Sequence, residues 1–358
     1  MKSARIGVLG CGKVSHMYLP ILLRSPAIEV AAIADADPAV AKAVSEQYQI
    51  ATVVSPDGLL ADPTIDIVLN LTPIAVHVGV TQAALRAGKH VYSEKSLATT
   101  VQDAQSLLSE AESRGLVLAC APDTLLGSGF QAAREALDGG RIGRALSASA
   151  AMFRSALTAP SFYTKGPTAF FDMSPYYLSA LVSLLGPVTR VSGATRTWPT
   201  DEKPADTATG ATIAISGTLE FAGGATASLT LSWGTGHRHE VPVLDVYGET
   251  GVIEFPNPNN FGDAAYIRGY ADADRSEIPG SRQDENLPHN LRGLGVAEMV
   301  LAVQEGRAPR ASGELAVHVV DLVASLVQSA EEGRRIDLTT TCQSPPPLAA
   351  DVRDQLLG

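Results

Sequence analysis

The first residues of the chain carry glycines at the spacing that binds a dinucleotide. A G-x-G-x-x-S pattern, which begins at Gly10, follows a short apolar run typical of a buried strand and precedes a segment with helical apolar spacing. In this context Gly10 allows a tight turn, Gly12 lets the backbone approach a pyrophosphate, and the helix N-terminus offers free N–H groups. Ser15 stands at the third small position and still permits close helix–strand packing. We therefore predict that Gly10, Gly12, Lys13 and Val14 bind the pyrophosphate of a cofactor.

An acidic residue ends the second apolar strand, which we expect over residues 29–34. This residue, Asp35, lies where a carboxylate in such folds accepts hydrogen bonds from both ribose hydroxyls. The carboxylate also repels the 2′-phosphate of NADP, and the following Ala36-Asp37 supplies no arginine that could hold that phosphate. The sequence therefore predicts NAD as the cofactor. The alternatives are an ordinary strand–turn–helix and a solvated acid at its turn.

Strand-like and helix-like segments alternate over about the first 120 residues, which predicts a doubly wound parallel sheet, an α/β Rossmann domain. The expected strands are 5–9, 29–34, 66–71, 90–92 and 117–121, and the expected helices are 13–24, 38–48, 55–60, 76–87 and 101–114. Ligands bind outside the carboxyl ends of the strands in such sheets. Asp35, Thr72-Pro73 and Glu94-Lys95 all follow strands, so we expect them to line one crevice.

A different texture begins at Pro122, so we predict an NAD-binding domain over residues 1–121 and a substrate-binding and oligomerisation domain over residues 122–358. The expected helices of the second domain are 129–137, 170–185, 291–304 and 313–331, and its expected strands are 145–153, 190–196, 211–216, 219–221, 224–233, 243–247 and 251–255. Residues 257–288 are expected to form a loop. These elements predict an α+β domain with an open, largely antiparallel sheet and helices on one face. Because apolar residues alternate over 225–231, we expect a homodimer or homotetramer through the other face.

The composition limits the classes of partner. The chain has 358 residues, of which 45% are hydrophobic, and a formal net charge of −11. This length favours two domains, and the acidic charge disfavours nucleic acid and anionic membranes as partners. No apolar run reaches the 18 or more residues of a membrane span. The three cysteines lack metal-ligand spacing, and the N-terminus lacks a signal peptide, so we expect a cytoplasmic protein without a bound metal.

Several motifs together resemble those of the glucose–fructose oxidoreductase, inositol dehydrogenase and MocA (Gfo/Idh/MocA) family. They are, in chain order, Gly10-Cys11-Gly12, Thr72-Pro73-Ile74-Ala75-Val76-His77, Ala87-Gly88-Lys89-His90-Val91, Ser93-Glu94-Lys95-Ser96 and Phe171-Asp172-Met173-Ser174-Pro175-Tyr176-Tyr177. The resemblance covers essentially the whole length. It implies NAD(P)-dependent oxidation or reduction of a secondary alcohol on a sugar, cyclitol or related polyol. By its spacing from Thr72-Pro73, His77 is expected near the cofactor, although a purely structural histidine is an equal alternative.

The resemblance identifies Lys95 as a catalytic candidate, because Glu94-Lys95-Ser96 matches the Glu-Lys-Pro block of the family. Beside a nicotinamide, the ammonium group can stabilise alkoxide character on a substrate hydroxyl while hydride leaves the same carbon. The alternative is a surface lysine after a strand. Ser96 departs from the family's proline. Either the Lys95–Ser96 bond is trans and Lys95 is displaced, or surrounding contacts hold the bond in the cis form.

In relatives, an Asp-x-Gly-x-His pattern brings an aspartate and a histidine to the reacting hydroxyl, and here it reads Asp172-Met173-Ser174-Pro175-Tyr176. Asp172 and Tyr176 are four residues apart, and therefore on one face of a helix. Tyr176 can act as the acid/base or can simply pack, and Asp172 can meet the hydroxyl or complement the helix dipole. His237, His239 and the loop around Lys165 are weaker candidates.

Three functions fit these residues. The first is an NAD-dependent dehydrogenase in which Lys95, Asp172 and Tyr176 orient and deprotonate a carbinol. The second is a redox-neutral glycoside hydrolase or lyase, in which NAD oxidises the sugar transiently and the hydride returns. The third is a non-catalytic NAD-binding sensor, suggested by Ser96 and by the missing histidine. Net NADH formation separates the first from the others.

Overall fold

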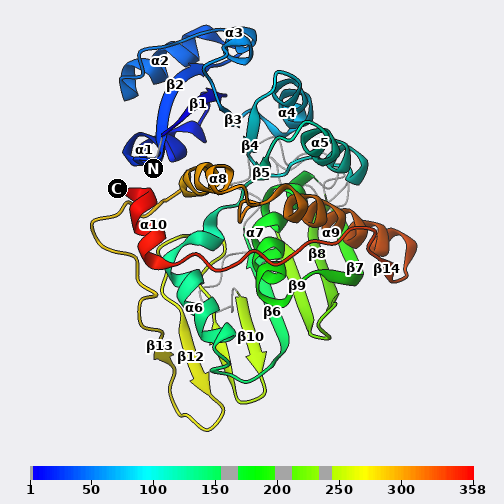
Figure 1. The fold of residues 1–358 in the computed structure, drawn as a ribbon. Coiled ribbons are helices and arrows are strands. Elements are labelled where there is room, and N and C mark those ends of the chain that lie inside the picture. The colour runs from blue at the N-terminus through cyan, green and yellow to red at the C-terminus, as the bar shows by residue number, and fades with distance from the viewer. Residues whose placement is uncertain (1–2, 155–167, 198–211, 234–243) are drawn as a thin grey trace. The chain divides into compact units, whose positions relative to one another are not determined.

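The computed structural model describes residues 3–154, 168–197, 212–233 and 244–358. The chain forms two compact units, shown in Figure 1. The first unit comprises Met1–Leu126, Asn286–Val317 and Pro345–Gly358, and the second comprises Gly127–Glu285 and His318–Ser344. The two domains predicted over residues 1–121 and 122–358 stay a prediction.

The described part of the first unit is built on a five-stranded parallel sheet with the order β2-β1-β3-β4-β5. Its strands are β1 (Ala4–Leu9), β2 (Ile28–Ala34), β3 (Ile67–Asn70), β4 (His90–Ser93) and β5 (Leu118–Cys120). All four residues of β3 are buried, as expected for a parallel strand that is covered on both faces. This sheet confirms the predicted doubly wound α/β fold.

Three helices of the first unit begin at capping residues that the sequence contains. The helices of this unit are α1 (Ser15–Arg24), α2 (Pro38–Tyr48), α3 (Pro56–Ala61), α4 (His77–Arg86), α5 (Val101–Ser113), α8 (Leu294–Glu305) and α10 (Ala350–Leu357), with the short 3₁₀ turns η1 (Ile74–Val76) and η2 (Thr124–Leu126). Asp37 caps α2, Ser55 caps α3 and Thr100 caps α5, each through a side-chain oxygen that accepts a backbone N–H.

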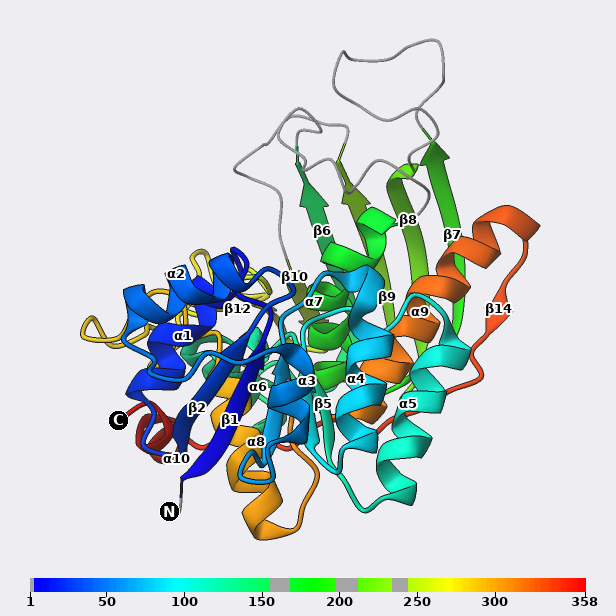
Figure 2. The ribbon, with the colours of Figure 1, turned by 90° about the horizontal axis from the view of Figure 1, so that it is seen from above.

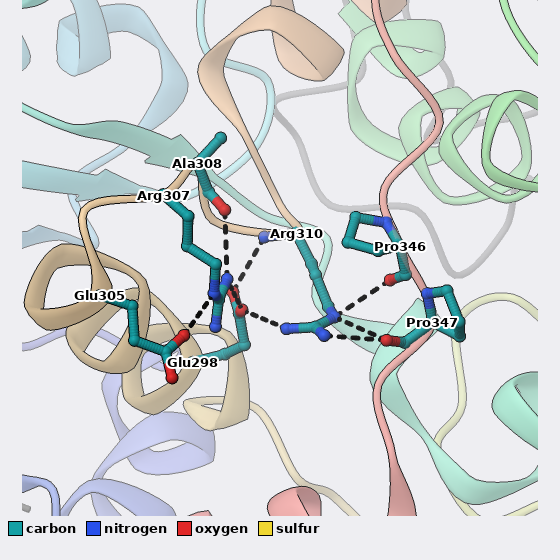
Figure 3. Close-up of polar contacts among 7 residues, drawn as sticks. All are labelled: Glu298, Glu305, Arg307, Ala308, Arg310, Pro346 and Pro347. Carbon is teal, nitrogen blue, oxygen red and sulfur yellow. Dashed lines mark hydrogen bonds and ion pairs between the residues drawn. The ribbon is translucent and has the colours of Figure 1, made fainter.

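The C-terminal segment is fastened to the first unit by charged side chains. Arg310 donates to the carbonyl oxygens of Pro346 and Pro347 at 3.0 and 2.8 Å, and it forms an ion pair of 2.6 Å with Glu298, as Figure 3 shows. Glu298 lies on α8 and is fully buried. Arg24 of α1 donates to the carbonyl oxygens of Leu357 and Gly358. Helix α10, which the sequence analysis did not predict, is therefore held at its C-terminal end.

The described part of the second unit contains a nine-stranded sheet with the order β13-β12-β11-β10-β6-β9-β8-β7-β14. Its strands are β6 (Ala145–Phe153), β7 (Val188–Thr197), β8 (Thr212–Phe221), β9 (Thr226–Ser232), β10 (Leu244–Gly248), β11 (Gly251–Glu254), β12 (Tyr266–Gly269), β13 (Ser276–Glu277) and β14 (Ile336–Asp337). Every neighbouring pair is antiparallel except β6 and β9. The predicted open, largely antiparallel sheet is confirmed.

Three helices cover one face of this sheet in Figures 1 and 2: α6 (Ser128–Asp138), α7 (Thr168–Leu185) and the part of α9 (Gly313–Glu332) that belongs to the second unit. The alternating residues Ala227, Leu229 and Leu231 are all buried. Leu229 pairs with Gly217, and a side chain added at Gly217 would strike Leu326 of α9. The apolar residues of 225–231 therefore face the helices, and the open face carries Thr226 and Ser228 instead.

Two predictions about the second unit are wrong. The sequence analysis divided 211–216 from 219–221, but β8 runs unbroken through Gly217. A Cβ at Gly217 would lie 2.5 Å from the Leu326 side chain and 2.6 Å from the Ser192 oxygen, so this glycine makes room for α9 and does not form a turn. Residues 257–288, predicted as a loop, contain β12 and β13. Both strands are short and polar, and they extend the sheet beyond β11 by backbone pairing.

Among the described residues, one helix has the length and apolar composition of a membrane span. This helix is α9, and 72% of its apolar window is buried inside the structure. The described residues contain no group of three or more histidine, cysteine, aspartate or glutamate side chains that could hold a metal ion.

Candidate active site

The glycine turn after β1 has the shape that a pyrophosphate needs. Gly10 has a φ of +99°, and a Cβ at this position would lie 2.7 Å from the carbonyl carbon of Leu71. A Cβ at Gly12 would meet no atom within 4 Å. The first glycine is therefore required by the turn itself, whereas the second leaves open space in front of the backbone. This difference matches the roles of the first two glycines of a dinucleotide-binding turn.

The start of α1 offers unpaired hydrogen-bond donors at this turn. Ser15 Oγ donates to the carbonyl oxygen of Gly12 at 2.7 Å, so the third small residue of the pattern stabilises the turn by a hydrogen bond. No side chain caps the helix at Val14. Within the described part of the chain, the N–H groups of Gly12, Lys13 and Val14 donate to no protein acceptor. Free N–H groups at the positive end of a helix dipole fit the pyrophosphate of NAD.

Asp35 is fixed beside this turn. Its Oδ2 accepts the Cys11 N–H at 2.8 Å, and its Oδ1 accepts the Asp37 N–H at 2.9 Å. A carboxylate has about four lone-pair sites, so the two bonds leave capacity for the ribose hydroxyls. Burial, and then the Asp35 charge, raises the pKa of Cys11 to about 11, so the thiol in the turn is uncharged at neutral pH.

The turn after β3 is held by a buried asparagine. Asn70 Oδ1 accepts the Thr72 hydroxyl at 2.6 Å, and Asn70 Nδ2 donates to the His77 carbonyl and to Thr81 Oγ1. The Nε2 atom of His77 lies 2.7 Å from the backbone carbonyl oxygen of Thr72, and its Nδ1 atom lies 2.8 Å from the backbone carbonyl oxygen of Ser96. His77 is 2% exposed, whereas Pro73 is exposed. The histidine thus joins the turn after β3 to the turn after β4.

The turn after β4 carries Lys95. The Glu94 N–H donates to the backbone carbonyl oxygen of Asn70, which continues the pairing of β3 and β4 into this turn. Glu94 Oε1 accepts the Tyr18 hydroxyl at 2.6 Å, and Glu94 Oε2 accepts the Lys95 N–H at 3.2 Å. The Lys95–Ser96 peptide bond is cis. Glu94 is buried and Lys95 is half-buried, so of the two side chains the lysine is the more accessible to a ligand.

The predicted substrate residues of the second unit lie on α7. Asp172 and Tyr176 are one helical turn apart, and Tyr176 is 6% exposed. Phe170, at the start of the same helix, contacts Trp233 with a ring-centroid distance of 5.3 Å. Arg154 Nη1 lies 4.0 Å from Met173 Sδ, next to Asp172 in the chain.

The structure thus groups the candidates by unit. Gly10, Gly12, Lys13, Val14 and Asp35 surround one turn. Thr72, His77, Glu94 and Lys95 belong to the two adjoining strand ends of the same unit. Asp172 and Tyr176 share a helix of the other unit. Lys165, His237 and His239 lie outside the described residues.

Sequence reasoning missed three residues of the first unit. Tyr18 was read as one apolar position of a helix, although a buried hydroxyl needs a partner. Asn70 lies in a predicted strand and was not singled out, although a buried side-chain amide needs hydrogen-bond partners. Asp123 is 1% exposed, and its Oδ2 accepts the N–H groups of Gly293 and Gly295, where α8 begins. Its partners are distant in the sequence, so no local pattern marks it.

Comparison with known proteins agrees with this geometry. The sequence model described as "Oxidoreductase family, NAD-binding Rossmann fold" matches residues 4–121, and that of the "GFO/IDH/MocA C-terminal domain" matches residues 130–254. A dTDP-3,4-didehydro-2,6-dideoxy-alpha-D-glucose 3-reductase from Streptomyces violaceoruber is 33% identical over 330 residues, which are 85% of this chain and 96% of that protein. A 1,5-anhydro-D-fructose reductase from Ensifer adhaerens is 32% identical over 145 residues, 40% of this chain and 44% of the relative.

Two solved structures show the same fold. Levoglucosan dehydrogenase in complex with NADH and levoglucosan superimposes with a TM-score of 0.80 at 20% identity, covering 95% of this chain and 100% of the other. An oxidoreductase from Agrobacterium radiobacter in complex with NAD+, L-tartaric acid and magnesium has a TM-score of 0.81 at 19% identity, covering 94% and 98%. The chain therefore belongs to the Gfo/Idh/MocA family of oxidoreductases and carries an NAD-binding Rossmann domain.

Proposed function

We propose that this protein is an NAD-dependent oxidoreductase that transfers a hydride between the nicotinamide and a carbon bearing a secondary alcohol on a sugar, cyclitol or related polyol. The observation that supports it most is the position of Lys95. This residue is the second one after β4, at the same edge of the parallel sheet as the glycine turn after β1 and Asp35 after β2. The glycine turn and Asp35 would hold a dinucleotide along this edge, to which Lys95 also belongs.

NAD, when bound, would supply the hydride acceptor for oxidation of the carbinol carbon, and NADH would supply the hydride donor for the reverse reaction. The Lys95 ammonium stabilises the negative charge that develops on the substrate oxygen, which is where a positioned cation lowers the barrier most. We propose that Asp172 and Tyr176 act on the same hydroxyl from one face of α7. In this scheme Asp172 orients the hydroxyl. Tyr176 takes its proton as the tyrosinate during oxidation and returns it as the phenol during reduction. The names of the two reductase relatives fit chemistry at a sugar carbonyl.

Preference for NAD over NADP is part of the proposal. Both oxygens of Asp35 are fixed by backbone N–H groups of the same unit, so the carboxylate cannot turn away from a 2′-phosphate without losing these bonds. The chain offers Ala36 and Asp37 next to it and no basic residue. A carboxylate that cannot move, beside a phosphate of the same charge, disfavours NADP.

We further propose a cytoplasmic homodimer or homotetramer that pairs through the open face of the nine-stranded sheet. This face carries small hydroxyl residues on adjacent strands, such as Ser147, Ser149, Thr226, Ser228 and Thr218, which alternate with buried residues. A flat face of small side chains allows close approach of a second sheet. Light scattering behind a sizing column measures the assembly, and a Ser228→Arg variant should shift it toward monomer. A wild-type monomer would contradict this part.

The test of function is absorbance at the reduced-nicotinamide band while the protein and NAD are offered sugars, inositols, sugar acids and glycosides, with product release followed in parallel. NADH that accumulates with a polyol, and does not with the Lys95→Ala variant, supports the dehydrogenase. Glycoside cleavage without net NADH would instead indicate redox-neutral chemistry. NAD binding without turnover of any compound would contradict an enzymatic role.

A further inference from the structure

Lys95 is the residue on which the proposed chemistry depends, and two side chains from distant helices fix the backbone on either side of it. We propose that Tyr18 and His77 are positioning residues, which hold the Glu94-Lys95-Ser96 turn so that the Lys95 ammonium meets the substrate oxygen. The inference rests on the proposed function of Lys95, and it assigns roles to two residues that do not themselves touch the substrate.

Tyr18 holds the turn from the side of Glu94. The tyrosine lies on α1, is fully buried, and donates to Glu94 Oε1 at 2.6 Å. Burial, and then the charge of Glu94, raises the pKa of Tyr18 well above its ordinary value, so its hydroxyl keeps the proton that it donates. The other oxygen of Glu94 accepts the backbone N–H of Lys95. One carboxylate therefore connects the tyrosine of α1 to the backbone of the lysine.

His77 holds the turn from the side of Ser96. The ring lies at the first residue of α4 and is 2% exposed, with Nδ1 at 2.8 Å from the Ser96 oxygen and Nε2 at 2.7 Å from the Thr72 oxygen. Both partners are carbonyl oxygens, which only accept. The neutral ring donates to one of them, and the imidazolium ion donates to both. The imidazolium ion therefore anchors both turns to α4, and the neutral ring with its proton on Nδ1 anchors the turn at Ser96.

The two anchors tie the lysine to the elements that bind the cofactor. Helix α1, which carries Tyr18, begins at the glycine turn, and the Thr72 carbonyl that faces His77 belongs to the turn after β3. Any displacement of the Lys95 backbone relative to these elements is therefore opposed by side-chain hydrogen bonds on both sides. Misplacement of a catalytic group by about 1 Å can reduce turnover about 10²-fold. The anchors thus suit a role in positioning the lysine relative to the nicotinamide.

Three variants separate positioning from packing. Tyr18→Phe keeps the buried ring and removes the hydroxyl, His77→Phe keeps a ring and removes both nitrogens, and His77→Gln restores one donor. Tyr48→Phe and His90→Gln are the matched controls. The half-buried Tyr48 shares a hydrogen bond with the His16 ring. His90 accepts the Val117 N–H at the start of β4, which is the end of the strand opposite to Lys95. Neither control residue contacts the Lys95 turn.

With the substrate found by the dehydrogenase assay, kcat should fall about 10- to 100-fold in Tyr18→Phe and His77→Phe. The KM for substrate and the Kd for NAD should stay within about twofold, because the binding groups are unchanged. His77→Gln should recover part of kcat, and both controls should behave like the wild type. Equal losses of NAD affinity and kcat, or wild-type kcat in both variants, would overturn the proposal.

A second readout does not need turnover. In protein labelled with [15N]lysine, the Lys95 amide signal is identified by its loss in Lys95→Arg, and its hydrogen exchange is followed in each variant. Exchange of this amide should be at least about tenfold faster in Tyr18→Phe than in Tyr48→Phe, because its acceptor Glu94 loses its own support. An unchanged rate in Tyr18→Phe and His77→Phe would overturn the proposal even if no substrate were found. Absence of NADH formation in the wild type would instead count against the proposed function alone.

Discussion

The carboxylate of Asp35 and the backbone N–H of Cys11 are joined by a hydrogen bond of 2.8 Å, which links the end of β2 to the glycine turn after β1. The residues proposed to recognise the ribose and the pyrophosphate therefore belong to one hydrogen-bonded structure. The two halves of the dinucleotide-binding pattern are far apart in the sequence, yet each fixes the other. Substitutions at Asp35 should accordingly affect the cofactor more than the fold.

The first prediction concerns Asp35→Ala. NAD should bind at least about 10- to 100-fold more weakly, because even one hydrogen bond to a charged acceptor contributes about 1.5–3 kcal/mol. The ratio of NADP affinity to NAD affinity should rise at least tenfold, to order of magnitude, because the repelling charge is removed. Isothermal titration with both cofactors measures this. Asp37→Ser is the control, since it removes a neighbouring charge but keeps a side chain that can cap α2. Unchanged affinities in Asp35→Ala would contradict the ribose assignment.

The second prediction contrasts the two glycines of the turn. Gly12→Ala should fold with the stability of the wild type, because its methyl group meets no atom within 4 Å, but NAD affinity should fall at least about tenfold, because the methyl group lies where the pyrophosphate approaches. Gly10→Ala should lose roughly 1–3 kcal/mol of stability, because its φ is +99° and its methyl group would strike Leu71. Thermal melting and NAD titration separate the two. Wild-type affinity in Gly12→Ala would place the pyrophosphate elsewhere.

Much of the first unit could be predicted because its signals are local. The strands of the parallel sheet are rich in apolar residues, and the capping residues Asp37, Ser55 and Thr100 mark where three of the helices begin. The helix that carries Asp172 was predicted to begin at residue 170, and α7 begins two residues earlier, at Thr168. The glycine turn and Asp35 could be proposed from the sequence because their spacing is what a dinucleotide requires.

The remainder could not be predicted because it depends on contacts between distant residues. Gly217 resembles a turn glycine in the sequence, and only the approach of Leu326 explains it. Strands β12 and β13 have no apolar period and exist through pairing with β11. Tyr18 meets Glu94 across 76 positions, and nothing near either residue predicts the other. The residues proposed from the sequence are therefore those expected to contact the ligands, and the missed residues are those that hold the neighbouring turns in place through hydrogen bonds.

The third prediction concerns pH. Burial, opposed by hydrogen bonds from Gly295 and Gly293 and by the charge of Arg292, raises the pKa of Asp123 from 3.8 to about 6. The folded state then binds this proton more tightly than the unfolded state does. The raised pKa of Asp123 therefore contributes about 3 kcal/mol of stability below pH 4, and this contribution is lost as the pH rises through about 6.

Asp123→Asn should remove this dependence, because an amide oxygen can accept the same two N–H groups without a charge. Denaturant unfolding at pH values between 4 and 7 measures the slope, and Asp274→Asn, at an exposed position, is the control. Between pH 4 and pH 7, the free energy of unfolding of the wild type and of the control should fall by more than that of Asp123→Asn. Identical slopes for all three proteins would show that Asp123 does not titrate in this range.

The fourth prediction concerns the ion pairs that hold the C-terminal segment. Glu298 is fully buried and is met by Arg307 and Arg310, each at 2.6 Å, and by the Arg310 N–H at 2.9 Å. Removing one partner of a buried charge typically costs about 3–5 kcal/mol, because the other charge stays buried without compensation. Because Arg307 still pairs with Glu298 in Arg310→Met, this variant should lose less stability than that full cost. It also removes the donors to Pro346 and Pro347.

The effect should be partly reversed in the double variant Arg310→Met with Glu298→Gln, because the buried carboxylate is then absent as well. Arg335→Ala is the control, since this arginine is 66% exposed in its ion pair with Glu220 and such pairs contribute about 0–1 kcal/mol. Denaturant unfolding gives the free energies, and limited proteolysis reports whether the segment from Pro345 onward is released first. A double variant as unstable as Arg310→Met would mean that the carbonyl contacts, and not the charge of Glu298, account for the loss.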